Sequence, residues 1–204
     1  MHEILPRIFT WGSTYVDRPW DLNGYAVALG GGTILIDPPA PEDADWPKFE
    51  ALKPISRIIL TNRDHIRDAE LFRQRFCARL VACVDEVNQF SPVVIDEMVR
   101  EGDVIAGLLH VIQLPGKSSG EIALLLEREH GGVLFLGDAI IGNPPSSLGL
   151  IPEQKLDDPS LLRRSLRKLL DYDFDKLLFC DGKPLLHGGR EAVEEFVRAI
   201  GARP

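Results

Sequence analysis

The sequence has few cysteines, and their spacing is not that of a disulfide or zinc framework. Among 204 residues there are three, Cys77, Cys83 and Cys180. No two of them form a Cys-x-x-Cys pair, and an odd number leaves at least one thiol unpaired in any disulfide scheme. We therefore expect free thiols that lie in the protein interior.

Basic clusters and long apolar runs are missing as well. Asp and Glu outnumber Lys and Arg by 31 to 23, and no Lys/Arg cluster is interleaved with aromatics, which argues against a nucleic-acid partner. No uninterrupted apolar run approaches the roughly 20 residues that a membrane helix needs, which argues against a membrane protein. Residues 1–7 do not lead from a basic segment into an apolar stretch, so we expect no secretion signal and a cytoplasmic protein.

What the sequence has instead is an alternation of short apolar runs and amphipathic stretches, which is typical of a mixed α/β protein. Strands are expected at 25–29, 33–37, 57–62, 80–84, 104–105, 108–114, 122–126, 133–136 and 177–180, and helices at 46–52, 68–76, 160–170 and 190–200. A chain of 204 residues with 45% hydrophobic residues can bury a substantial core. One domain over residues 1–204 is the simplest expectation.

One pattern occurs twice along the chain. Residues 31–37 and 131–138 each consist of a glycine turn, an apolar strand and an aspartate at its C-terminal end, and each is followed by a helix and another strand. Two similar halves would pack their sheets face to face, with the helices outside and the polar strand ends along one edge. The polar residues expected to meet there are Asn62, Asp64, Asp138 and Asp181. Alternatively, the repeat is only the alternation that any α/β protein shows.

Five fragments, in order, carry a resemblance to a known family. They are Leu-Ile-Asp at 35–37, Ile-Leu-Thr-Asn-Arg-Asp-His at 59–65, Pro-Gly-Lys-Ser-Ser-Gly-Glu at 115–121, Leu-Gly-Asp-Ala at 136–139 and Phe-Cys-Asp-Gly at 179–182. This order resembles the metallo-β-lactamase superfamily, in which a strand leads into a THxHxDH motif, later strands carry a PGHTPG-like turn and a Gly-Asp pair, and a last strand ends at a histidine. The resemblance covers nearly the whole chain. It implies an α/β (α+β) fold, the four-layer αββα sandwich of metallo-β-lactamase type.

The resemblance breaks at the metal ligands. If Asp64 and His65 match the DH of the first motif, the segment from Thr61 is two residues short, and Asn62 takes the place of one early histidine. Matching from Thr61 without a gap instead puts Asn62 and Asp64 at the first two histidines, and it places Arg67 beside a cation. We prefer the first alignment because it retains two chemically sensible ligands.

The remaining family positions are assigned without ambiguity. Lys117 replaces the histidine of the PGHTPG turn, Asp138 stands at the bridging aspartate, and Asp181 stands at the last histidine. The resemblance then implies that one metal position is lost and that the other keeps Asp64, His65 and Asp138 and gains Asp181. This oxygen-rich set suits Mn²⁺, Fe²⁺ or Mg²⁺ better than a structural zinc. The expected cofactor is one divalent metal (Mn, Fe or Zn), or none.

Two functions are compatible with this set of residues. The first is a hydrolase with catalytic roles at Lys117 and Asp64, in which the cation activates water and Lys117 polarises a substrate oxygen. Its substrate would contact Asn62, Arg63 and Arg67, the arginines through a carboxylate or phosphate. The alternative is a non-catalytic binding or interaction protein that retains the fold without metal, with Lys117 and the aspartates in a salt-bridged cluster. Either would bind a small molecule, and either is compatible with a homo-oligomer.

Overall fold

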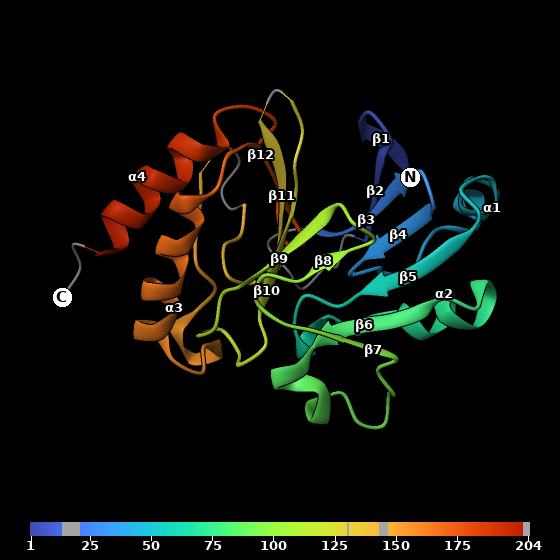
Figure 1. The fold of residues 1–204 in the computed structure, drawn as a ribbon, viewed down its shortest axis with the longest axis horizontal. Helices are drawn as coiled ribbons and strands as arrows, with labels where there is room; N and C mark the ends of the chain where they lie inside the picture. The colour runs from blue at the N-terminus through green and yellow to red at the C-terminus, as the bar shows by residue number, and fades with distance from the viewer. Residues whose placement is uncertain (14–20, 130, 143–146, 202–204) are drawn as a thin grey trace. The chain divides into compact units, whose positions relative to one another are not determined.

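The chain forms two compact units, Met1–Val99 and Arg100–Pro204, called here the N-terminal and C-terminal units. The computed structural model describes residues 1–13, 21–129, 131–142 and 147–201. Figure 1 shows a sheet and helices in each unit. Among the described residues, none of the helices is both long and apolar enough to cross a membrane. The expectation of one domain over residues 1–204 stays a prediction.

The N-terminal unit is built on a seven-stranded sheet in which the strands follow one another in sequence order. Its strands are β1 (His2–Leu5), β2 (Ile8–Ser13), β3 (Leu22–Leu29), β4 (Gly32–Ile36), β5 (Ile55–Ile59), β6 (Arg79–Cys83) and β7 (Glu97–Val99). The pairs from β1 to β4 are antiparallel, and those from β4 to β7 are parallel. The carboxyl ends of β4, β5 and β6 therefore lie at one edge of the sheet.

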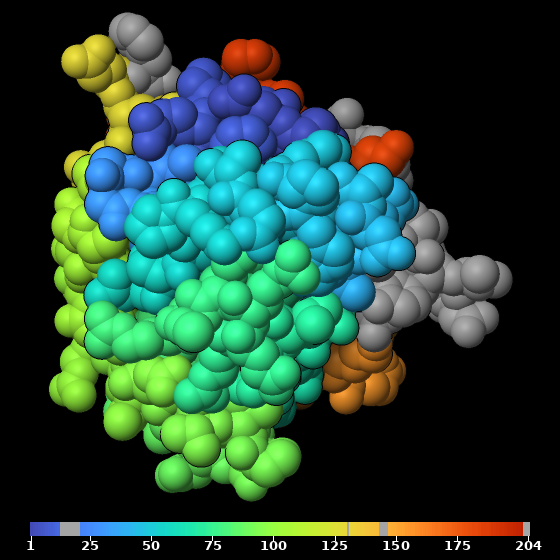
Figure 2. All heavy atoms as spheres, turned by 90° about the vertical axis from the view of Figure 1, so that its right-hand side faces the viewer, coloured from blue at the N-terminus to red at the C-terminus, as the bar shows by residue number. Residues whose placement is uncertain are grey.

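Two helices pack on one face of this sheet, α1 (Trp46–Ala51) and α2 (Ala69–Phe76). Phe49 of α1 and Phe72 of α2 are fully buried, and their ring centroids lie 5.0 Å apart. Trp11 of β2 meets Phe49 edge to face at 4.8 Å. Figure 2 shows the segments of α1 and α2, in cyan and green, covering this side of the unit. Aromatic packing therefore fixes both helices against the sheet.

The C-terminal unit has a five-stranded sheet of order β12-β11-β10-β9-β8. Its strands are β8 (Val104–Ile105), β9 (Leu109–Gln113), β10 (Ile122–Leu126), β11 (Gly132–Leu136) and β12 (Phe174–Phe179), and its helices are α3 (Pro159–Ser165) and α4 (Gly189–Gly201). Every residue of β10 and β11 is buried, as expected for continuous apolar runs at the centre of a sheet. Asp158 caps α3, because its side chain accepts the Leu161 N–H at 2.8 Å.

The repeated pattern of the sequence corresponds to a repeated topology. In the N-terminal unit, β4 pairs antiparallel with β3 and parallel with β5, and in the C-terminal unit β11 pairs antiparallel with β10 and parallel with β12. Each of these strands is followed by a helix and then by its parallel neighbour. Each unit therefore carries two neighbouring parallel strands whose carboxyl ends lie at the same edge.

Three strands and the end of one helix differ from the elements predicted from the sequence. Strands β1, β2 and β7 were not expected, and the helix expected at 160–170 is α-helical only to Ser165, with a 3-10 helix over Leu166–Asp171. Ser165 explains this break. Its Oγ lies 3.0 Å from the Leu162 carbonyl and 2.8 Å from the Pro115 carbonyl, and such bonding back to the preceding turn disturbs the α-helical hydrogen bonds.

Asp175 of β12 is hydrogen-bonded to the loop that precedes α4. This bond makes the free energy of unfolding depend on pH. The Gly188 N–H donates to Asp175 Oδ1 at 2.8 Å, and this bond, with the neighbouring Lys176 and His187, lowers the pKa of Asp175 below its ordinary value. A lowered folded-state pKa contributes stability above the unfolded pKa, and this is lost as pH falls through the folded pKa. Below about pH 4, the wild type should therefore lose more stability than Asp175→Asn.

Urea unfolding between pH 7 and pH 3 measures this difference, with the exposed Asp171→Asn as the matched control. The control should follow the wild-type pH dependence. If Asp175→Asn and the wild type lose stability in parallel, the loop bond does not contribute.

Candidate functional site

Asp37 joins the ends of β4 and β5. It follows β4 directly, and its Oδ1 accepts the Thr61 N–H at 2.8 Å, while its Oδ2 accepts the Thr61 hydroxyl at 2.5 Å. Both residues are fully buried. Asp37 has a φ of 45°, a left-handed conformation that is rare outside glycine. A buried carboxylate in such a backbone conformation is typical of functional sites.

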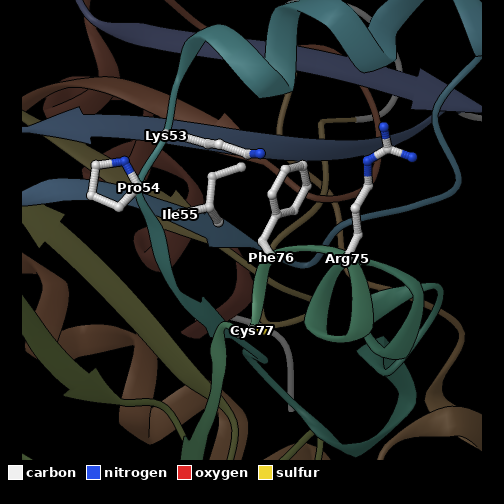
Figure 3. Close-up of a pocket in the computed structure, with 6 residues that line it drawn as sticks. All are labelled: Lys53, Pro54, Ile55, Arg75, Phe76 and Cys77. Atoms are coloured by element: carbon white, nitrogen blue, oxygen red, sulfur yellow. The ribbon is translucent and has the colours of Figure 1, made fainter.

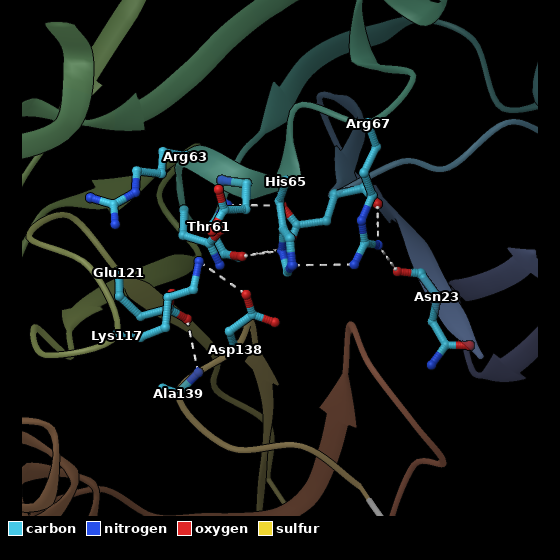
Figure 4. A network of polar contacts seen from close by, with 12 residues as sticks. Asn23, Thr61, Arg63, His65, Arg67, Lys117, Glu121, Asp138 and Ala139 are labelled. Atoms are coloured by element: carbon cyan, nitrogen blue, oxygen red, sulfur yellow. Dashed lines mark hydrogen bonds and ion pairs between the residues drawn. The ribbon is translucent and has the colours of Figure 1, made fainter. Parts of the chain in front are cut away.

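His65 lies between this carboxylate and an arginine. Its Nδ1 is 2.8 Å from Asp37 Oδ2 and 3.0 Å from Thr61 Oγ1, and its Nε2 is 3.2 Å from Arg67 Nη2 (Figure 4). A guanidinium can only donate, so Nε2 must accept. The ring proton is therefore assigned to Nδ1, which donates to Asp37, and the imidazole is the neutral tautomer.

Asn62 and Asp64 are brought together by a helix cap. Asn62 precedes the 3-10 helix Arg63–His65, and its Oδ1 accepts the Asp64 N–H at 2.9 Å. Asn62 is buried and Asp64 is exposed. The side chain of Asn62 therefore has a structural role in holding the turn that presents His65.

Arg63 is turned toward a different part of the N-terminal unit. Its backbone N–H donates to Glu86 Oε2 at 2.9 Å, and its Nη1 donates to Gln89 Oε1 at 2.7 Å. Figure 4 shows its side chain pointing away from His65. The two predicted substrate-binding arginines, Arg63 and Arg67, thus have separate sets of partners.

In the C-terminal unit, Lys117 and Asp138 form an ion pair. Lys117 Nζ lies 3.0 Å from Asp138 Oδ2, and the two side chains are only 2% and 10% exposed (Figure 4). Glu121, also fully buried, accepts the Ala139 N–H at 3.1 Å and so holds the backbone next to Asp138. The predicted partnership of Lys117 and Asp138 therefore has a geometric basis within one unit.

Asp138 and Asp181 stand at equivalent positions of neighbouring parallel strands. Leu136 of β11 is in register with Phe179 of β12, and each aspartate comes two residues later. Both side chains are largely buried, with exposures of 7% for Asp138 and 5% for Asp181. The strand ends of this unit therefore bring two carboxylates and one lysine to the same edge of the sheet.

A surface hollow of about 490 Å³ in the N-terminal unit lies apart from these residues. It is lined by Lys53, Pro54, Ile55, Arg75, Phe76 and Cys77 (Figure 3). Its two cationic side chains are both paired with Glu50. None of the predicted site residues lines it, so it gives no support to the predicted chemistry.

Two of the predicted metal ligands have a cationic side chain against the atom that would bind the ion. Metal binding needs the lone pair of an imidazole nitrogen, but His65 Nε2 already accepts from Arg67 and its Nδ1 is directed at Asp37. Asp138 has the Lys117 ammonium against its carboxylate. Two of the four expected ligands are thus engaged by cationic side chains, which a metal ion at either residue would have to displace.

Sequence reasoning did not single out Asp37, Thr61 or Glu121 as site residues. Asp37 could have been found, because it occupies in the first repeat the strand-end position that Asp138 occupies in the second. Thr61 stands at the start of the first family motif, and nothing in its residue type indicates a bond to a carboxylate on the neighbouring strand. No pattern in the sequence marks Glu121 as a site residue.

Solved structures with the same fold were found at low sequence identity. A metallo-beta-lactamase from Pontibacter korlensis is 15% identical, with a TM-score of 0.77 over 98% of this chain and 98% of that one. A metallo-beta-lactamase family protein from Thermus thermophilus is 20% identical, with a TM-score of 0.69 over 98% of this chain and 81% of that one. TTHA1623, solved in a di-iron-bound form, is 22% identical, with a TM-score of 0.68 over 86% and 94%.

These similarities confirm the predicted fold class, the αββα sandwich of metallo-β-lactamase type. No curated protein matches the sequence. The family model of the metallo-beta-lactamase superfamily matches residues 2–200, nearly the whole chain. The chain therefore belongs to the metallo-beta-lactamase superfamily.

Proposed function

We propose that this chain is a metal-independent binding protein that uses the hydrolase-like fold of its superfamily to hold a small molecule. The supporting observation is the buried pair of Lys117 and Asp138, with 3.0 Å between Nζ and Oδ2. Burying a carboxylate is costly unless a positive charge lies beside it, and here a lysine supplies that charge. The site can therefore keep its shape without a metal ion.

The proposed ligand is a cytoplasmic small molecule with a carboxylate or phosphate group; Asn62, Arg63 and Arg67 are the predicted contacts, of which Asn62 already caps a turn and Arg67 already bonds His65. The Arg63 side chain is 26% exposed and points away from His65 (Figure 4), so the proposal rests on this arginine. Its planar guanidinium can bind a carboxylate or phosphate through two parallel hydrogen bonds.

Metal analysis tests this proposal. Protein purified without chelator should contain much less than one Mn, Fe or Zn per chain, and Asp138→Ala should leave that content unchanged. About one metal ion per wild-type chain, lost in Asp138→Ala, would overturn the proposal.

Lys117→His provides the converse test. The change removes the ammonium and supplies an imidazole, which is a common metal ligand, so bound metal should rise well above the wild-type content. The matched control is Lys155→His, at an exposed lysine of the same unit. The control should bind no more metal than the wild type. Equal metal content in both variants would show that the lysine does not stand in for a cation.

A second candidate is a hydrolase that uses one divalent metal, with the predicted ligands Asp64, His65, Asp138 and Asp181. The observation that favours it is the presence of two buried carboxylates, Asp138 and Asp181, at matching strand ends beside one lysine. Lys117 and Asp64 would then be the catalytic side chains. This candidate requires that Asp138→Ala and Asp181→Ala each abolish a metal that the wild type carries.

A further inference from the structure

His65 makes one of the two contacts that are typical of a metal-ligating histidine. Such histidines usually donate one ring N–H to a carboxylate and bind the metal through the other nitrogen. The contact with a carboxylate is present, because Nδ1 lies 2.8 Å from Asp37 Oδ2. At the other nitrogen, Nε2, the neighbour is Arg67 Nη2 at 3.2 Å (Figure 4). We propose that the Arg67 guanidinium takes the place of a metal ion at His65 and thereby prevents metal binding there.

Arg67 is held in this position by bonds that do not involve His65. Its Nη1 donates to the Asn23 carbonyl at 2.9 Å and to the Asp37 carbonyl at 3.0 Å. Its backbone is left-handed, with a φ of 41°. A side chain anchored to two carbonyls does not move aside without losing both bonds, so the guanidinium is a fixed part of the site.

The charges of this group also favour the arginine over an added metal. The Asp37 carboxylate and the Arg67 guanidinium carry opposite charges, and the neutral His65 ring connects them. A divalent ion at Nε2 would meet a guanidinium already within hydrogen-bonding distance of that nitrogen, and the repulsion between cations at such a separation is large in a partly buried site. The inference rests on the proposed metal-independent function and names the residue that enforces it in the N-terminal unit.

Arg67→Gly is the variant that isolates this role. Glycine adopts the left-handed backbone of position 67 without strain, so the change removes the guanidinium with little cost to the turn. Co²⁺ added to the metal-free variant should bind at least tenfold more tightly than to the wild type, as measured by calorimetry and by the visible absorption of the bound ion. Arg67→Asn, which also tolerates this backbone conformation, should show the same gain and covers the case in which the glycine variant is unfolded.

Two controls establish that the gain occurs at His65. The double variant Arg67→Gly/His65→Gln should bind Co²⁺ no better than the wild type. Arg79→Ala removes an exposed positive charge from the same unit without touching Nε2, and it should leave Co²⁺ affinity unchanged.

The possible failures are distinguishable. Wild-type protein that holds one Co²⁺ tightly would contradict the proposed metal-independent function. Wild-type affinity in both Arg67→Gly and Arg67→Asn would overturn the inference about Arg67 alone. A gain that persists in the double variant would also overturn it, because the ion would then be bound elsewhere.

Discussion

Lys117→Met is expected to lower the free energy of unfolding by about 3–5 kcal/mol, because it removes one partner of a buried ion pair. Methionine fills nearly the same space as the lysine stem, so little of the loss should come from packing. The loss should come from Asp138, whose carboxylate would remain buried without the ammonium that lies 3.0 Å away in the wild type. Urea unfolding at pH 7, followed by circular dichroism, measures the change.

Two further variants separate charge pairing from other causes. Lys155→Met makes the same substitution at an exposed lysine and should change stability by less than about 0.5 kcal/mol. Asp138→Asn in the Lys117→Met background removes the stranded charge and should restore a substantial part of the lost stability. If Lys117→Met is as stable as the wild type, the pair does not hold the C-terminal strand ends together.

Both units contain a buried carboxylate at a strand end, and each unit neutralises it with a different cationic side chain. In the N-terminal unit, the carboxylate of Asp37 reaches the guanidinium of Arg67 through His65. In the C-terminal unit, the carboxylate of Asp138 contacts the Lys117 ammonium directly. Asp37 and Asp138 are thus each linked to a cation of their own unit, and this makes a metal-independent site physically reasonable.

The strand-end carboxylates could be predicted from the sequence because they depend on short-range patterns. An apolar run followed by an aspartate places that residue at the end of a strand, and parallel neighbours bring such ends to one edge. This reasoning found Asp138 and Asp181, whose strands are parallel and in register. The short strand β7 could not be predicted in this way, because Glu97–Val99 has three residues and only one of them is buried.

The contact between Arg67 and His65 could not be predicted, because it depends on backbone conformation. Arg67 and Asp37 both have left-handed φ angles; an aspartate is a weak signal of this conformation in a sequence, and an arginine gives none. The alignment without a gap would put Arg67 beside a cation. The structure offers another interpretation of that position, in which the arginine is itself the cation beside the histidine.

The second large effect is expected at Gly116, in the turn that carries Lys117. Gly116→Ala should lower the free energy of unfolding by about 3 kcal/mol or more, which corresponds to a fall in Tm of roughly 6–12 °C for a chain of this size. Gly116 has a φ of 131°, and a Cβ there would lie 2.5 Å from Leu162 Cα in the first turns of α3. The clash is with backbone, so no side-chain rotation can relieve it.

The loss should also reach the site, because the turn and the start of α3 are hydrogen-bonded. The Asp158 N–H donates to the Gly116 carbonyl at 2.8 Å, and the Asp157 N–H donates to the Lys117 carbonyl at 3.1 Å. An alanine that separates Gly116 from Leu162 must strain these bonds and shift the lysine that they position.

Two glycine controls separate the cost of the clash with α3 from the cost of backbone strain. Gly102 has a left-handed φ of 82°, and a methyl group added there would have nothing within 4 Å, so Gly102→Ala should cost about 1 kcal/mol from backbone strain alone. Gly30 has open space and no such φ, so Gly30→Ala should be close to neutral. Thermal unfolding of the three variants should rank them in this order. A Gly116→Ala variant no less stable than Gly102→Ala would mean that the turn is not packed against α3, and that Lys117 is positioned by other contacts.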